Sequence, residues 1–147
     1  MSDLAAFLSA RLDEDEAAAK AAASVAGPDW RFDLADSYLK SPLGSFVADT
    51  MNAPYGDEAI GPFLARHSPG RVLRDVEAKR AILAEHGPAN GGRDADRCRV
   101  CTAITHTGAG HTDARRFRAP CPTLLFLAAV YSDHPDYRQE WAVSPLG

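Results

Sequence analysis

The chain opens with a hydrophobic pattern that repeats at helical spacing. Its first apolar positions stand at i, i+3, i+4 and i+8, which places them on one face of a helix. These positions are Leu4, Phe7, Leu8 and Leu12. An alanine-rich stretch continues the helical pattern to Ala26, where Gly27 and Pro28 interrupt it. The sequence therefore predicts an N-terminal helix within residues 1–26.

The middle of the chain changes from strand-like to helical patterning. Residues 30–50 contain short runs of strand-forming side chains separated by turn residues, which predict two or three short antiparallel strands. Residues 57–86 then predict helices. Ser68 and Pro69 favour the start of the longer helix, because serine can cap free backbone N–H groups and proline fits the first helical position.

The last third of the chain is polar first and apolar afterwards. Residues 87–121 contain glycines and charged side chains and predict a knuckle with irregular loops. Residues 122–141 predict a C-terminal helix and turn. Because this helix is apolar nearly all round, we expect it to be the central buried helix.

Composition narrows the class of protein. The 147 residues fit a single domain, and a hydrophobic fraction of 46% is enough for a core. No apolar run reaches the roughly 18 residues of a membrane span. The N-terminus carries an early acid and no basic segment, so we expect no secretory signal, a cytoplasmic location and no membrane partner.

The three cysteines form the strongest chemical motif in the chain. Cys98 and Cys101 have C-x-x-C spacing, and Cys121 follows. Two such cysteines can direct both sulfurs at one tetrahedral metal, and a third thiolate with one histidine completes a Cys₃His zinc site. An odd number of reduced thiols favours metal over disulfides. We predict a structural zinc that contributes on the order of 10 kcal/mol to folding; three free thiols are the alternative.

The fourth ligand has three candidates. His86 ends the long predicted helix, so its use would join that helix to the knuckle and to the helix that begins at Cys121. His111 leaves nine residues to Cys101 and nine to Cys121, which is a workable closure. His106 follows Cys101 more closely, which makes a tighter arrangement. Spacing alone leaves the choice open.

Charge is distributed unevenly along the chain. Residues 1–65 carry 11 acidic and 4 basic side chains, whereas residues 66–118 carry 6 acidic and 11 basic ones. A basic stretch around a zinc site indicates phosphate contacts, although solvent-exposed or mutually paired charges explain the pattern equally simply. The candidate nucleic-acid-binding residues are Arg93, Arg97, Arg99, Arg115, Arg116 and Arg118.

Several segments together resemble a known family. They are Phe7–Glu16, Ala65–Arg80 with His86 shortly after, the C-x-x-C, Pro120–Leu124, and Tyr131–Tyr137 with Trp141. This combination resembles a family of short uncharacterised proteins from actinobacteria and their phages. The resemblance implies no activity, but the shared histidine after the Glu-Ala-Lys-Arg helix favours His86. A longer and more basic loop at 102–119 keeps His111 in contention.

The sequence thus predicts a small, mainly helical α+β domain over 1–147, with a short β-hairpin and a zinc-stapled knuckle between two helices. No phosphate-binding glycine motif and no H-E-x-x-H motif occurs, so no enzyme is indicated. We expect a non-enzymatic zinc-binding adaptor, phage-derived and regulatory, with a protein partner. The alternatives are a nucleic-acid-binding protein and a zinc enzyme with an open Cys₃–water site.

Overall fold

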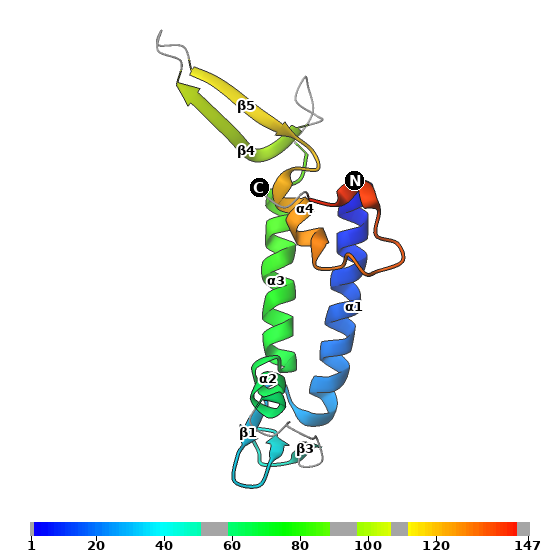
Figure 1. Cartoon of the computed structure of the whole chain (residues 1–147), viewed down its shortest axis with the longest axis vertical. Coiled ribbons are helices and arrows are strands. Elements are labelled where there is room, and N and C mark those ends of the chain that lie inside the picture. The colour runs from blue at the N-terminus through cyan, green and yellow to red at the C-terminus, as the bar shows by residue number, and fades with distance from the viewer. Residues whose placement is uncertain (1, 51–58, 89–96, 107–111, 144–147) are drawn as a thin grey trace. The chain divides into compact units, whose positions relative to one another are not determined.

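The computed structural model describes residues 2–50, 59–88, 97–106 and 112–143 (Figure 1). In chain order the elements are α1 (Asp3–Ala26), β1 (Arg31–Asp33), β2 (Tyr38–Lys40), β3 (Phe46–Asp49), α2 (Ile60–Arg66), α3 (Pro69–Glu85), β4 (Arg97–His106), β5 (Thr112–Arg118), α4 (Pro122–Ala129) and the 3₁₀ turn η2 (Gln139–Trp141). The fold is α+β and mainly helical, as the sequence predicts.

Internal contacts group the chain into two compact units. We call them the terminal unit (Met1–Leu12 with Lys79–Gly147) and the middle unit (Asp13–Ala78). Each is described by itself, and a single domain over 1–147 stays a prediction.

The apolar stripe of α1 forms one side of the core of the terminal unit. Leu4 and Leu8 are each 1% exposed, and Phe7 is also buried. Leu124 and Ala128 of α4 pack in the same cluster, and Figure 1 shows α4 beside the first turns of α1. The helical spacing of these side chains therefore predicts both the helix and its buried face.

Phe7 is the centre of an aromatic cluster in the terminal unit. Its ring centroid lies 6.3 Å from that of Tyr131, 6.1 Å from that of Tyr137 and 5.0 Å from that of Trp141. Tyr137 and Trp141 also meet edge to face, a favourable arrangement for aromatic pairs. The segment after α4 has little regular structure, so these ring contacts hold it against α1.

Two strands from residue 97 onward correct part of the prediction of irregular loops over 87–121, and residues 89–96 of that range lie outside the described residues. β4 and β5 pair antiparallel, with Ile104 opposite Ala114 and His106 opposite Thr112. The β-branched residues in Thr102–Thr105 favour a strand, and the two nearby glycines belong to the connection between strands. That connection, residues 107–111, lies outside the described residues.

Helix α4 is less buried than predicted. It ends at Ala129, and only Leu124 and Ala128 are buried within it. Phe126 is 51% exposed and Val130, just after the helix, is 61% exposed. Among the described residues, the helix therefore presents one face to the core and leaves an apolar face at the surface.

The middle unit contains the short strands expected within residues 30–50. They form one antiparallel sheet in the order β1-β2-β3, with Phe32 opposite Leu39 and Leu39 opposite Ala48. Leu39 of the central strand is 1% exposed. Alternation within such short strands is enough to place one side chain of β2 in the core.

The region predicted to be helical, residues 57–86, contains two helices, α2 and α3, with Ser68 between them. Residues 57 and 58 lie outside the described part of the chain. The carbonyl of Ser68 accepts the N–H groups of Arg71 and Val72, so α3 begins at Pro69 as its capping pattern indicates.

A close approach between α2 and β1 depends on Gly61. A Cβ atom at this position would lie 2.3 Å from two ring carbons of Phe32 and 2.7 Å from Cγ of the same ring. Cγ is fixed near the backbone, so the ring cannot simply swing aside. The absent side chain therefore lets α2 pack directly on the sheet.

Replacing Gly61 tests this contact. We expect Gly61→Ala to destabilise the protein by about 1–2 kcal/mol, because overpacking outweighs the gain in helix propensity. Gly87→Ala is the matched control, since its added methyl would meet its nearest neighbour at 3.6 Å. Urea unfolding measures both; a Gly61→Ala protein as stable as the control would contradict the proposed contact.

Candidate metal centre

Three elements bring the candidate ligands together. His86 directly follows α3, and its N–H donates to the carbonyl of Ile82 at 2.9 Å, which continues the helical pattern by one residue. Cys121 occupies the N-cap position of α4, and its carbonyl accepts the N–H of Leu124 at 3.0 Å. The remaining pair, Cys98 and Cys101, lies on β4.

The C-x-x-C motif forms a bulge in the hairpin. Arg97 pairs with Arg118, and the next pair is Thr102 with Arg116. Four residues of β4 therefore stand opposite a single residue of β5, so the motif leaves the regular ladder. A bridge between Pro88 and Cys98 attaches this bulge to the segment that follows α3.

The four side chains converge on one point. Nδ1 of His86 lies 3.7 Å from Sγ of Cys98, 3.3 Å from Sγ of Cys101 and 3.5 Å from Sγ of Cys121. All four donor atoms lie within 4.8 Å of one another. A tetrahedral zinc with ordinary bond lengths separates sulfur from nitrogen by about 3.6 Å. The spacing therefore fits a single tetrahedral ion.

Hydrogen bonding alone does not account for this cluster. Nδ1 of a neutral imidazole has one lone pair or one proton, so it can serve one sulfur well and not three. Cys98 and Cys121 are both 0% exposed, which removes water as a partner. A divalent cation would satisfy all four donors at once, and a Cys₃His set suits zinc.

Backbone groups and burial act in opposite directions on the thiols. Burial opposes ionisation of Cys98, but the backbone N–H groups of Cys101 and Val100 point at its sulfur, and the net effect is a pKa below the ordinary value. The Cys101 N–H lies 3.4 Å from this sulfur. Burial raises the pKa of Cys101 to about 11. A bound cation would reverse that preference, because metal ligation favours the thiolate.

One polar neighbour of the cluster is not indicated by the motif. Oγ1 of Thr123 lies 3.8 Å from Sγ of Cys101. Thr123 stands in the first turn of α4, two residues after Cys121, so the Pro-Cys-Pro-Thr run is the signal that could have identified it. Its hydroxyl can form a hydrogen bond with the Cys101 sulfur and so help to orient it.

The other candidate ligands and arginines are placed differently. His111 and Arg93 lie outside the described residues. His106 lies at the far end of β4, opposite Thr112, whereas the C-x-x-C bulge lies near the start of that strand. Arg115 stands opposite Ala103 on the ladder. For these strand positions the structure describes the backbone register alone.

Arg99 has a structural contact within the terminal unit. Its Nη2 donates to the carbonyl of Ala84 at 2.8 Å and lies 3.5 Å from a carboxylate oxygen of Glu85. The N–H of Arg99 also donates to the carbonyl of Gly87 at 3.0 Å. A cation at the C-terminal end of a helix is favourable, so Arg99 connects the bulge to the end of α3.

These features define a small α+β protein with a compact Cys₃His cluster that could hold a metal ion, between a helix end, a hairpin and a helix start. The chain belongs to a family of unknown function, DUF6221, whose model matches residues 1–143. This agrees with the resemblance to uncharacterised proteins seen in the sequence. No curated protein and no solved structure matches the chain.

Metal content tests the ligand set. We expect purified protein to contain one zinc per chain by elemental analysis, and each of Cys98→Ser, Cys121→Ser and His86→Ala to lose most of it. Loss of a ligand to structural zinc lowers affinity steeply because the remaining donors no longer complete the tetrahedron.

The same measurement on His111→Ala and His106→Ala supplies the matched controls. Full zinc in both, together with depleted zinc in His86→Ala, assigns the fourth ligand to His86. If His86→Ala retained its zinc, the centre would instead have three thiolates and an open position or another histidine.

Proposed function

We propose that this protein is a non-enzymatic zinc-binding adaptor in which the metal is structural. The single observation that carries the proposal is the equidistance of His86 Nδ1 from the three sulfurs, at 3.3–3.7 Å. Four protein donors close a tetrahedral zinc to substrate, whereas catalytic zinc sites keep one position for water.

The proposed zinc would add a shared bond to segments that are distant in the sequence. His86, Cys98 and Cys121 come from three different elements, and two of these side chains belong to the core cluster of the terminal unit. The hairpin β4–β5 has no other sheet partner among the described strands. The metal would therefore fix the base of the hairpin against α3 and α4.

The exposed surface of the terminal unit favours binding of a protein partner. Exposed apolar side chains stand on the hairpin base and on α4, at Val100, Phe117, Phe126 and Val130, which are 47–61% exposed. We infer that these side chains contribute to one surface, since contiguous exposed apolar patches are typical of interaction sites. A cytoplasmic setting and a regulatory role in an actinobacterium or its phage complete this proposal. In the part of the chain that the structure describes, no helix is long and apolar enough to cross a membrane.

Chelation tests the structural role. We expect a strong zinc chelator to lower the melting temperature markedly and to increase amide hydrogen exchange first in the described residues between His86 and Leu124, because the metal joins these segments. Exchange within β1–β3 of the middle unit serves as the internal reference. An unchanged melting curve after the zinc has been removed would reject the structural role.

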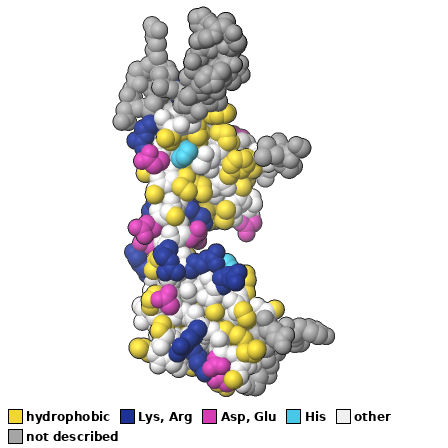
Figure 2. Space-filling model, turned by 90° about the vertical axis from the view of Figure 1, so that its left-hand side faces the viewer, with side chains coloured by type: hydrophobic (Ala, Val, Ile, Leu, Met, Phe, Trp, Pro, Cys, Tyr) yellow, Lys and Arg dark blue, Asp and Glu magenta, His cyan; other side chains and the backbone are white. Residues whose placement is uncertain are grey.

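Nucleic-acid binding is the second candidate, favoured by the arginines of the hairpin. β4 and β5 carry five arginines and a single acidic residue, and Arg97 stands directly opposite Arg118. Against it, Arg99 is engaged by α3. Figure 2 shows acidic and basic side chains interspersed among the coloured residues of one face.

Salt dependence decides between the two candidates. A nucleic-acid-binding hairpin would bind short DNA or RNA with an affinity that falls steeply as salt rises, and Arg97→Gln with Arg118→Gln would reduce the slope by about two. Fluorescence anisotropy between 50 and 200 mM salt measures this. The adaptor proposal predicts no binding that depends on these arginines.

A further inference from the structure

The candidate metal centre places three sulfur atoms close enough to react with one another. All three, together with a ring nitrogen of His86, lie within 4.8 Å of one another. A disulfide bond requires two of these sulfurs to approach to about 2.05 Å. A zinc ion would hold the cysteines as thiolates, which is the form that oxidants attack. The same donors can therefore bind a metal or form a disulfide.

Exposure distinguishes one sulfur from the other two. Cys98 and Cys121 are both 0% exposed, whereas Cys101 is half-buried. Oxidation of cysteine depends on access as well as on thiolate character, so a small oxidant meets Cys101 first. The geometry therefore favours Cys101 as the site of the first attack.

Cys98 is the sulfur best placed to complete a disulfide with Cys101. Both residues belong to the bulge of β4, which lies outside the regular ladder, and the N–H of Cys101 lies 3.4 Å from the Cys98 sulfur. Cys121 instead holds the start of α4, where its carbonyl accepts the N–H of Leu124 at 3.0 Å. Closing the pair within the bulge needs only a local change of backbone, whereas a bond to Cys121 would join two elements.

We propose that the zinc centre is a redox switch, in which a hydroperoxide such as hydrogen peroxide oxidises Cys101 and joins it to Cys98. This step rests on the structural zinc proposed for the same site. The Cys101 thiolate attacks the peroxide, the O–O bond breaks, and a sulfenic acid and hydroxide form. The Cys98 thiolate then attacks that sulfur and displaces a second hydroxide. Two thiolates thus lose two electrons in total, and the peroxide gains them.

Oxidation removes two of the four ligands. His86 and Cys121 alone do not complete a tetrahedral zinc site, so the ion leaves. The base of the hairpin is then no longer joined to α3 and α4 through the metal. Since Val100 and Phe117 stand exposed on that hairpin, oxidation would change the apolar surface that the adaptor offers to a partner.

The test treats the zinc-loaded, full-length protein with hydrogen peroxide in the absence of reductant. A chromogenic indicator follows zinc release, and a sample without peroxide corrects for zinc taken by the indicator. We expect peroxide to release the zinc, and a thiol reductant with added zinc to restore it. Protein that contains zinc and keeps it under peroxide would overturn the redox step alone, whereas protein isolated without zinc would overturn the structural zinc as well.

Peptide mapping identifies the bond that forms. The three cysteines fall in three different tryptic peptides, because trypsin cleaves after Arg99 and Arg118. We expect mass spectrometry to find the peptides of Cys98 and Cys101 joined, with Cys121 free for alkylation. A bond to Cys121 would overturn the assigned pair. Zinc release with sulfinic acid in place of a disulfide would indicate damage and would overturn the switch.

Thr123 supplies a graded test of the first attack. Its hydroxyl oxygen lies 3.8 Å from the Cys101 sulfur, and a hydrogen bond donated to a thiolate lowers its reactivity. We expect Thr123→Val to accelerate zinc release about two- to tenfold, as one hydrogen bond to sulfur is lost. Thr123→Ser keeps the hydroxyl and is the matched control. Equal rates in the two variants would overturn Cys101 as the site of attack.

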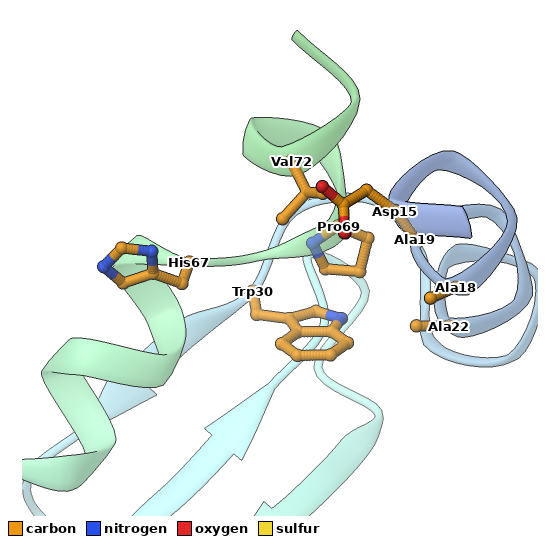
Figure 3. A pocket seen from close by; sticks show the side chains of 8 residues that line it. All are labelled: Asp15, Ala18, Ala19, Ala22, Trp30, His67, Pro69 and Val72. Atoms are coloured by element: carbon orange, nitrogen blue, oxygen red, sulfur yellow. The ribbon is translucent and has the colours of Figure 1, made fainter. Parts of the chain in front are cut away.

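The two tryptophans distinguish a local change from general unfolding. Trp141 belongs to the same buried cluster as two of the cysteines. Trp30 lies in the middle unit, where its indole N–H donates to the carbonyl of Gly27 at 3.1 Å and its ring lines a surface pocket beside Pro69 (Figure 3). On oxidation we expect the indole N–H resonance of Trp141 to shift in NMR spectra and that of Trp30 to stay in place. Collapse of both resonances to unfolded positions would overturn a local switch.

Discussion

One constraint shapes the terminal unit. The sulfur atoms of its three cysteines and a ring nitrogen of His86 lie within 4.8 Å of one another, close enough to bind a single metal ion. Two of the cysteines are completely buried, so their donors have exchanged water for one another. As thiolates without a cation, these buried cysteines would carry an unfavourable charge. As thiols, they would form only weak hydrogen bonds. A bound divalent cation would resolve both problems. The same four donor atoms would then explain why the end of α3, the bulge of β4 and the start of α4 meet.

The ligands and the apolar core of this unit are one structure. Cys98 and Cys121 pack in the same cluster as Leu4, Leu8 and Trp141. A unit with so few buried apolar side chains has limited hydrophobic stabilisation, and small folds commonly supplement it with a metal or a disulfide. The middle unit is organised differently: its described residues form a three-stranded sheet with ion pairs of Lys40 to Asp33 and Asp36, and α2 approaches this sheet closely at Gly61. Among the described residues, the terminal unit therefore has a cluster of donors that could hold a metal ion, and the middle unit has none.

This division also separates two features of the surface. The base of the hairpin and α4 present apolar side chains around a metal that would make them rigid. The pocket at Trp30 presents an aromatic wall and a carboxylate on the acidic part of the chain.

Local rules of sequence determined a large part of this protein. Helical spacing identified α1 and its buried face, strand-forming runs identified β1–β3, and Ser68-Pro69 identified the start of α3. The clustering of the cysteines identified three donors of the candidate centre, because C-x-x-C geometry is itself local. The paired strands β4 and β5, the exposed side of α4 and the meeting of His86 with all three sulfurs were decided only by tertiary structure. Each depends on which distant segments pack together, since a histidine 12 residues before one sulfur and 35 before another has no local signal that distinguishes it from a nearer one.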